Sequence, residues 1–422
     1  MCQLDGLSRM AYKVEVIKSE DNGERVVLVL DESGMPHDLI SRYLLRGLFN
    51  RSSKTILNQA RNICQLYQWG DELGINIEER IYSGEIFGIT EIDSLVRYLS
   101  LNRRQMRILK GTSSKDTIIP FAGYVTADMQ KQKIDDIARY FKWIGSLSLE
   151  NRSINDPFYT SIGPAMDDLK DRLDALKVRG SSQPRVGLKE DEQQFLISIT
   201  SPNNKNNPFE HRTRVRNHLI FKMLLLCGAR LGELLSLKPE QCKLAGDSPY
   251  IIISQNTTKH LDPRKLPPES KTLSRKIYIT PELASDIDSY INNERKARGK
   301  AAKRAAPYLF LNTWKAPSPM TQSAVQHMCK ILRERFPDKL ANLHPHRLRH
   351  TFNDNLHMMF FNKMGKEAFL KMQRWLNGWV DDSEQGYTYT HLAMEIQGKR
   401  MLIHLQESIM KGDYEYLHIN EH

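Results

Sequence analysis

The stretch Leu343-His-Pro-His-Arg-Leu-Arg-His-Thr-Phe352 sets His346 and Arg349 three residues apart at the start of a predicted helix. Residues with this spacing share one helix face, so both side chains are expected to point toward the same place. An imidazole can move a proton near neutral pH, and a guanidinium can grip a phosphate with paired N–H groups. The pair alone is a weak signal, because basic residues at a helix start are usually solvated. The pair becomes a more specific signal when the motifs around it are considered.

The composition of the chain indicates a globular protein with a polyanionic partner. Its 422 residues suffice for two or three domains with separate cores, and 40% of them are hydrophobic. Lys and Arg number 61 against 50 Asp and Glu, a formal net charge of +11. This excess favours nucleic acid over a membrane surface as the partner. Charge alone leaves a merely basic soluble protein as an equal alternative.

Neither a membrane span nor a metal site is expected. The longest apolar run, Leu219 to Leu226, is interrupted by Lys222 and falls far short of the roughly 20 residues that a membrane helix needs. The N-terminal residues lack the apolar core of a signal peptide. The five cysteines are scattered without a CxxC pair, which argues against a zinc knuckle and a disulfide framework. We therefore expect a reduced, cytoplasmic protein without a metal or cofactor.

The first 178 residues are predicted to form a hairpin followed by a helical module. Residues 1–38 contain two apolar runs separated by Asn22-Gly23, the pair typical of a two-residue type I′ turn, so a β-hairpin extension is expected. Residues 39–178 are expected to be all-helical, with Trp69 and Trp143 packed in the core rather than stacked on bases. The predicted helices are Ser52–Leu73, Glu91–Leu99, Asp128–Leu147 and Pro164–Leu176.

A second domain is predicted from residue 189 to residue 422. Residues 179–188 have the composition of a linker. Two strands, Tyr250–Ser254 and Lys276–Ile279, are joined by a polar loop, and Thr280-Pro281-Glu282 opens a helix. The other predicted helices are Lys189–Ile199, Thr213–Leu226, Pro319–Phe336, His346–Asn362 and Gly365–Leu376. The predicted fold class is mainly α, with a small antiparallel β-sheet in the second domain.

Five motifs of the second domain resemble, in residue types and in order, the catalytic segments of the tyrosine recombinase (phage integrase) family. They are Gly228-Ala-Arg230 with Glu233, Ser270-Lys271-Thr272, the His-x-x-Arg box of Pro345–Phe352, Leu376-Asn-Gly-Trp379, and Tyr387-Thr-Tyr-Thr-His-Leu392. The resemblance covers roughly residues 40 to 400. It implies a core-binding domain over residues 39–178 and a catalytic domain over residues 189–422, which close around duplex DNA as a two-domain clamp.

The resemblance also implies a site that cleaves and rejoins DNA without metal or ATP. Arg230 and Arg349 would hold the non-bridging oxygens of the scissile phosphate, for which paired guanidinium N–H groups suit better than an ammonium. Tyr389 would attack the phosphorus and form a covalent 3′-phosphotyrosyl link. Lys271 would protonate the leaving 5′-oxygen, and His346 would assist proton transfer or hold the phosphate.

Two further residues complete the predicted site. Trp379 would donate its indole N–H to the phosphate while its ring buttresses the site. Glu233 would orient a neighbouring arginine or His346. The predicted catalytic set is therefore Arg230, Lys271, His346, Arg349, Trp379 and Tyr389.

Some assignments have rivals nearby in the chain. The loop from Lys259 to Lys276 carries six basic residues, so Lys265 and Lys259 compete with Lys271 as the general acid, and any of the six could instead contact backbone phosphates. Tyr387 competes with Tyr389 as the nucleophile, although the Tyr-Thr-His-Leu context favours Tyr389.

The remaining histidines, a tryptophan and a basic cluster are given other roles. His344 is expected at the surface, and His350 and Trp375 are expected to be structural core residues. The cluster Arg295–Arg304 is either a solvated helix end or a contact to DNA phosphates.

By resemblance, the predicted function is that of a site-specific DNA recombinase or integrase. Its partner would be double-stranded DNA, and four protomers would act on two sites through a Holliday junction. The tail Met394–His422 is a candidate for docking on a neighbouring subunit. The alternatives are a type IB topoisomerase or resolvase-like enzyme with the same catalytic set, and a catalytically silent DNA-binding protein. The target site, the biological outcome and the role of residues 1–38 stay open.

Overall fold

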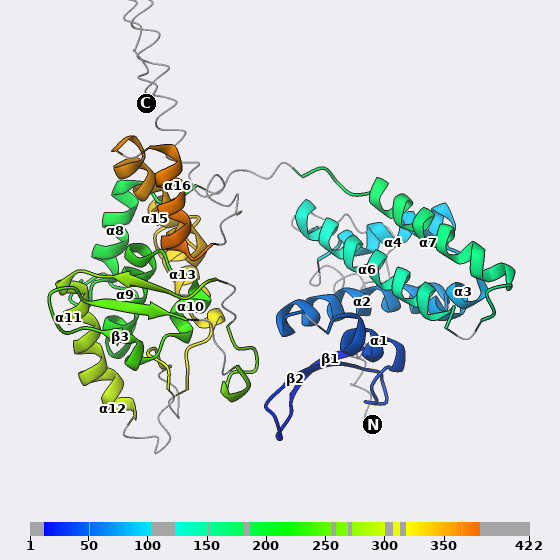
Figure 1. Cartoon of the computed structure of the whole chain (residues 1–422), viewed down its shortest axis with the longest axis horizontal. Coiled ribbons are helices and arrows are strands. Elements are labelled where there is room, and N and C mark those ends of the chain that lie inside the picture. Colours follow the sequence, from blue (N-terminus) through cyan, green and yellow to red (C-terminus); the bar gives the residue numbers. More distant parts are fainter. Residues whose placement is uncertain are drawn as a thin grey trace, which may run out of the picture. The chain divides into compact units, whose positions relative to one another are not determined.

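The computed structural model describes residues 12–49, 51–102, 123–150, 152–180, 186–254, 259–268, 272–299, 307–312, 318–363 and 365–379. The chain divides into two compact units, Met1–Ser182 and Gln183–His422, here the first and the second unit (Figure 1). The division falls inside the interval 179–188, to which the sequence analysis assigns a linker. Among the described residues, no helix is both long enough and apolar enough to cross a membrane.

The first unit is a two-stranded hairpin packed on a set of helices. Its elements are β1 (Lys13–Lys18), β2 (Arg25–Leu30), α1 (Asp38–Arg42), the π-helical turn η1 (Tyr43–Gly47), α2 (Ser53–Leu73), α3 (Ile77–Ser83), α4 (Ile89–Ser100), α6 (Ala127–Leu147) and α7 (Pro157–Ala175). Local sequence sets the ends of α2, because the Ser52 side chain accepts a hydrogen bond from the Thr55 N–H and Gly74, at a φ of 66°, ends the helix. Trp69 is buried in the core and Trp143 packs against it, as predicted.

The hairpin belongs to the core of the first unit. Its strands β1 and β2 pair antiparallel along their whole length. Val27 and Val29 of β2 are buried in the same core as α2, which lies beside the hairpin in Figure 1. The predicted two-residue Asn-Gly turn is wrong, because residues 19–24 form a longer connection between the strands. The Asn22 side chain accepts a hydrogen bond from the Glu24 N–H at 2.9 Å, and this local bond stabilises the wider loop.

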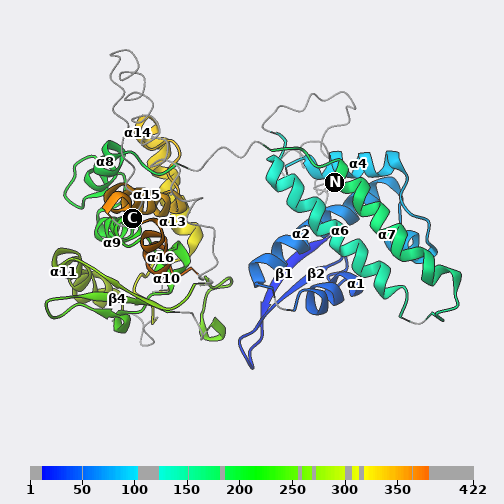
Figure 2. The ribbon, with the colours of Figure 1, turned by 45° about the horizontal axis from the view of Figure 1, so that its top comes forward.

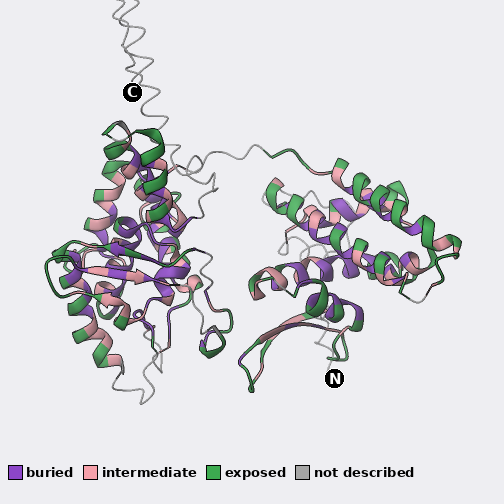
Figure 3. Ribbon diagram, viewed as in Figure 1, coloured by how far each residue is buried: buried purple, intermediate pink, exposed green. Residues whose placement is uncertain are grey.

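The second unit consists of helices around a small antiparallel sheet, which confirms the predicted fold class. The sheet order is β3 (Cys242–Lys243), β4 (Tyr250–Ile253) and β5 (Arg275–Tyr278). The helices and helical turns are α8 (Glu190–Thr200), α9 (His211–Cys227), α10 (Leu231–Ser236), η3 (Pro239–Gln241), η4 (Lys259–Leu261), α11 (Pro281–Tyr290), η5 (Ile291–Arg295), α12 (Lys296–Gly299), α13 (Gln322–Arg335), α14 (Pro337–Leu340), α15 (Pro345–Phe360), η6 (Phe361–Lys363) and α16 (Lys366–Asn377). Helices α9 and α15 lie side by side in the middle of the unit (Figure 2). Buried residues line the inner sides of the helices and the sheet (Figure 3).

The predicted starts of two helices are wrong. Helix α13 begins at Gln322 instead of Pro319, because Thr321 is its N-cap residue and its hydroxyl accepts a hydrogen bond from the Ala324 N–H at 3.2 Å. Helix α7 begins at Pro157 instead of Pro164, because the Asp156 side chain accepts a hydrogen bond from the Phe158 N–H at 2.9 Å and Pro157 takes the first helical position. Pro164 therefore lies inside the helix. The short α3 and η1 were not predicted, since neither is long enough to show a clear apolar period.

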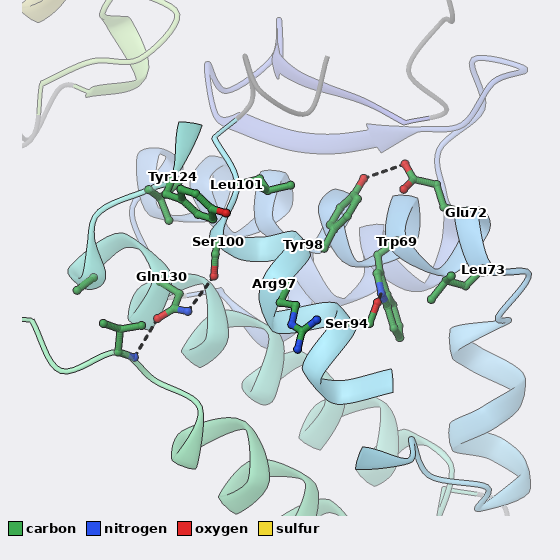
Figure 4. Close-up of a pocket in the computed structure, with 13 residues that line it drawn as sticks. Trp69, Glu72, Leu73, Ser94, Arg97, Tyr98, Ser100, Leu101, Tyr124 and Gln130 are labelled. Carbon is green, nitrogen blue, oxygen red and sulfur yellow. Dashed lines mark hydrogen bonds between the residues drawn. The ribbon is translucent and has the colours of Figure 1, made fainter. Parts of the chain in front are cut away.

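A hollow of about 570 Å³ lies in the first unit between the end of α2, α4 and the start of α6 (Figure 4). Its lining is largely apolar, and several of the polar groups that line it bond one another. Trp69 Nε1 donates to Ser94 Oγ at 3.1 Å, and the Tyr98 hydroxyl donates to Glu72 Oε1 at 3.1 Å. The predicted catalytic residues all belong to the second unit.

Candidate active site

Arg230 follows the turn that ends α9. Gly228 in this turn has a φ of 58°, and a Cβ at its position would lie 2.3 Å from Cδ1 of Phe352. Glycine is therefore required both by the backbone conformation and by the close approach of α15. Arg230 is the N-cap residue of α10, and its backbone N–H donates to Glu233 Oε2 at 3.0 Å. Its Nη1 lies 3.5 Å from Glu233 Oε1, so one carboxylate contacts both ends of Arg230.

Arg349 is buried near the start of α15, with only 1% of its surface exposed. Its Nη1 donates to the carbonyl oxygen of Gly228, and its Nη2 donates to the carbonyl oxygen of Asn377 at 3.1 Å. The guanidinium lies 5.6 Å from the centroid of the Trp379 ring, a distance at which a cation and a π-system attract each other. One guanidinium thus joins the end of α9, the helix α15 and the end of α16.

Trp379 lies directly after the glycine that ends α16. Its backbone N–H donates to the carbonyl oxygen of Arg374 at 3.0 Å, and its side chain is buried. The prediction that Trp375 is a core residue is wrong, since it is 51% exposed. Helix α16 buries a face defined by Phe369, Gln373 and Asn377, at steps of four residues, and Trp375 falls on the opposite side.

His346 lies on the first turn of α15 and contacts His350 one turn further along. Their rings meet edge to face with 4.8 Å between centroids. His346 is partly exposed, whereas His350 is buried, as expected of a structural residue. His344, expected at the surface, is the half-buried N-cap residue of α15, because its Nδ1 accepts a hydrogen bond from the Arg347 N–H at 3.1 Å. Within the described ranges, no three His, Cys, Asp or Glu side chains form a group that could hold a metal ion.

Glu233 is the common partner of two separate segments. Besides Arg230, its fully buried carboxylate accepts hydrogen bonds from the Thr272 hydroxyl and from Arg275 Nη2, the latter at 2.8 Å. Burial acts to raise the pKa of this carboxyl, but the charge and hydrogen bonds of Arg275, the Thr272 hydroxyl and the charge of Arg349 together lower the pKa below its ordinary value of 4.5. The carboxylate is therefore ionised at neutral pH.

A network of three buried amides, not predicted from the sequence, supports the Asn377 carbonyl. Asn353 Nδ2 donates to the Arg349 carbonyl oxygen at 2.9 Å, and Asn377 Nδ2 donates to Asn353 Oδ1 at 2.8 Å. Gln373 Nε2 also donates to Asn353 Oδ1, at 3.2 Å. These bonds join α15 to α16 and position the carbonyl that holds Arg349. The one available signal was the spacing of Gln373 and Asn377, which places two amides on one helix face.

Two of the six basic residues between Lys259 and Lys276 are buried in ion pairs, so the prediction that any of the six could contact phosphates is wrong for them. One is Arg275. The other is Arg264, whose Nη2 lies 2.6 Å from Asp262 Oδ2 and whose Nη1 donates to two carbonyl oxygens. Lys265 is exposed. The predictions for Lys271, Tyr387 and Tyr389, and for the side chain of Lys259, concern parts of the chain outside the described residues.

The basic cluster Arg295–Arg304 is partly used for internal packing. Arg295 Nε donates to the carbonyl oxygen of Tyr308 at 3.1 Å, and Arg298 Nη2 donates to that of Arg212 at 2.7 Å. These two side chains therefore stabilise their own unit. Residues 300–304 lie outside the described ranges.

Comparison with known proteins identifies the class of the second unit. Residues 188–395 match the model of the phage integrase family, and this range takes in all six predicted catalytic residues. The matched range lies within the second unit. Residues 188–395 therefore carry a phage integrase family domain, and the resemblance inferred from the five motifs is confirmed.

Individual relatives agree with this family but are distant. The tyrosine recombinases XerC of Bacillus licheniformis and Bacillus pumilus are 27% identical over 189 residues and 28% identical over 190 residues. Each alignment covers 45% of this chain and 53% of the relative, so the chain spans about half the length of these curated relatives. The structure of the Tn1549 transposon integrase in complex with transposon right end DNA is 17% identical, with a TM-score of 0.50 over 86% of this chain and 98% of that one. This last likeness concerns the fold alone.

We expect Gly378→Ala to lower the free energy of unfolding of the second unit by about 3 kcal/mol in urea denaturation. Gly378 has a φ of 64°, and a Cβ there would lie 2.7 Å from Arg275 Nη1 and 3.0 Å from the Leu273 carbonyl oxygen. Gly246→Ala is the matched control, since Gly246 has a φ of 90° but no atom within 4 Å of the added Cβ. It should cost only the roughly 1 kcal/mol of a left-handed alanine. Equal losses for the two variants would show that the packing at Gly378 is unimportant.

We expect Glu233→Gln to lower the free energy of unfolding by about 3 kcal/mol at pH 7, because it leaves Arg275 buried without a counter-ion. The pKa of Glu233 is lowered on folding, so its stabilising contribution is present above 4.5 and is lost as the pH falls through the folded-state value. The gap between wild type and variant should therefore narrow below pH 4.5 in denaturation curves recorded from neutral to acid pH. A gap that stays constant would mean that Glu233 is not ionised in the folded protein.

Proposed function

We propose that this protein is a site-specific DNA recombinase that cleaves and rejoins strands through a covalent 3′-phosphotyrosyl intermediate. The observation that carries the proposal is the shared support of two arginines by one turn. Arg349 donates to the carbonyl oxygen of Gly228, and Glu233 holds Arg230 two residues further along the same turn. Two guanidiniums fixed in this way are suited to a single phosphate, whose non-bridging oxygens gain charge in the transition state.

In the proposed reaction, the hydroxyl oxygen of Tyr389 forms a bond to phosphorus while its proton passes to His346. The bond between phosphorus and the 5′-oxygen breaks, its electron pair leaves with that oxygen, and Lys271 supplies the proton. Arg230 and Arg349 stabilise the charge on the pentacoordinate phosphorus. A 5′-hydroxyl from a partner duplex then reverses these steps and reseals the strand. The phosphotyrosine retains the bond energy, so no ATP is needed.

The roles of Lys271 and Tyr389 rest on the sequence motifs, while the support of the arginines rests on geometry. Trp379 is proposed to donate its indole N–H to the phosphate, with its ring packed against the Arg349 guanidinium. Because Arg349 is buried and bonded to two carbonyl oxygens, its orientation is set before DNA binds. Donors that need no reorganisation are the more effective at stabilising a transition state.

The proposed substrate is double-stranded DNA, and the proposed assembly is four protomers on two sites. The formal net charge of +11 favours a polyanion, and the Tn1549 integrase is described in complex with transposon DNA. We assign residues 39–178 to DNA clamping and residues 189–422 to catalysis. Residues 179–188 would be the linker that lets the two domains close on a duplex in the cytoplasm.

The decisive experiment is a search for the covalent adduct. Tyr389→Phe protein is expected to bind DNA without cutting it, so it is used to recover preferred sequences from a random pool. The recovered duplex (the selected duplex) becomes the probe. Wild-type protein should form an adduct with the selected duplex that survives denaturing electrophoresis. Tyr389→Phe should form none, because phenylalanine lacks the attacking oxygen.

Tyr387→Phe is the matched control and should retain the adduct. An adduct with Tyr389→Phe but not with Tyr387→Phe would move the nucleophile to Tyr387, and no adduct from any protein would favour a silent DNA-binding protein. Relaxation of a one-site plasmid without joining of two sites would favour a topoisomerase. EDTA should leave the adduct yield unchanged, since arginines rather than a metal neutralise the phosphate in this mechanism.

A further inference from the structure

Arg275, the first residue of β5, forms a buried ion pair that the proposed reaction does not use. Its side chain is 2% exposed, and its Nη2 lies 2.8 Å from Glu233 Oε2. Its Nε donates to the carbonyl oxygen of Leu376 at 2.8 Å, and its Nη1 lies 3.4 Å from Thr272 Oγ1. One planar guanidinium therefore contacts α10, the end of α16 and the chain just before β5. Only arginine can reach three such partners in one plane.

Each partner of Arg275 lies next to a residue of the proposed site. Glu233 holds the backbone and the head group of Arg230. Leu376 precedes Asn377, whose carbonyl oxygen holds Arg349. The ion pair thus lies one covalent or hydrogen-bonded step from both phosphate-binding arginines.

The third partner, Thr272, directly follows Lys271 in the chain. Its hydroxyl donates to Glu233 Oε1, and the next backbone N–H, that of Leu273, donates to the Gly378 carbonyl oxygen at 3.1 Å. The segment 272–275 is therefore attached both to α10 and to the end of α16. Gly378 allows this contact, since a Cβ there would lie 3.1 Å from Thr272 Cβ and 3.0 Å from the Leu273 carbonyl oxygen.

We propose that Arg275 is a positioning residue for protonation of the leaving group. By holding Glu233 and Thr272 together, it fixes the position of Thr272, the residue that follows Lys271 in the chain. The inference rests on the proposed function, in which the Lys271 ammonium gives its proton to the 5′-oxygen as the bond from phosphorus to that oxygen breaks. Without Arg275 this proton arrives late or not at all, so the 5′-oxygen departs slowly and formation of the phosphotyrosyl bond slows with it.

Changing the leaving group distinguishes a defect in its protonation from a defect in phosphate binding or folding. If sulfur replaces the 5′-bridging oxygen of the scissile phosphate, the leaving thiolate is a weak base and departs without a proton. A defect in the general acid, which is worth roughly 10²- to 10⁴-fold, should then disappear. A defect in phosphate binding or in folding should persist with both substrates.

The test compares Arg275→Met with wild type on the selected duplex, with oxygen or sulfur at the mapped cleavage position. We expect Arg275→Met to slow adduct formation about 10²-fold on the oxygen duplex and to come within about 5-fold of wild type on the sulfur duplex. Lys271→Met should show the same rescue. The rate of adduct formation under single-turnover conditions is the measured quantity.

Arg264→Met is the matched control for losing a buried arginine. Arg264 is 3% exposed, pairs with Asp262 at 2.6 Å, and donates to the carbonyl oxygens of Leu235 and Met320 at 2.9 Å. Its loss also leaves a carboxylate buried without a counter-ion, so the stability of the second unit should fall in a similar way. The ratio of the oxygen rate to the sulfur rate should nevertheless stay at the wild-type value.

Several outcomes would overturn the inference. If Arg275→Met forms the adduct equally slowly with both duplexes, Arg275 is a purely structural residue. If it forms the adduct at the wild-type rate with the oxygen duplex, Arg275 has no role in protonation of the leaving group. Failure of sulfur to rescue Lys271→Met would mean that Arg275 positions no proton donor at residue 271, while the proposed cleavage would stand. If wild type forms no adduct with either duplex, the proposed function itself fails.

Discussion

The structure of the candidate site depends on a single buried carboxylate, that of Glu233. Removing a carboxylate from water is costly unless charge and hydrogen bonds replace the lost hydration. Here Arg275, the Thr272 hydroxyl and the Arg230 backbone N–H supply the replacement. Because these groups come from segments far apart in the chain, the carboxylate is satisfied only when the segments meet. The need of this carboxylate for hydrogen-bond and charge partners therefore constrains how the segments of the site are arranged.

Arg349 carries a second buried charge, which also needs partners from other segments of the chain. Its guanidinium bonds two backbone carbonyl oxygens, which glycine at position 228 and the amide network at Asn377 place within reach. A phosphate-binding arginine on an exposed helix face would sample many rotamers and lose that freedom on binding. Folding has already fixed the rotamer of Arg349. The loss of side-chain entropy therefore lowers the stability of the protein and does not weaken phosphate binding.

Sequence reasoning succeeded where the signal was local and fell short where it was not. Helix ends such as Ser52 and Thr280 were predictable because the capping side chain and its target lie within three residues. The family motifs also singled out Arg230, Arg349 and Trp379, and Arg349 lies against Trp379 and the turn that precedes Arg230. The contact of Glu233 with the neighbouring Arg230 was predictable, whereas the partners from distant segments were not. Arg275 reads as one more basic residue of a polar loop, because its carboxylate lies 42 positions away in the chain.

The central claim is that Arg230 and Arg349 hold one scissile phosphate. A crystal structure of the Tyr389→Phe protein bound to the selected duplex tests this most directly. We expect both guanidiniums to lie within hydrogen-bonding distance of the non-bridging oxygens of the same phosphate, with the Glu233–Arg275 ion pair intact. Guanidiniums on two different phosphates, or a scissile phosphate that contacts neither arginine, would contradict it.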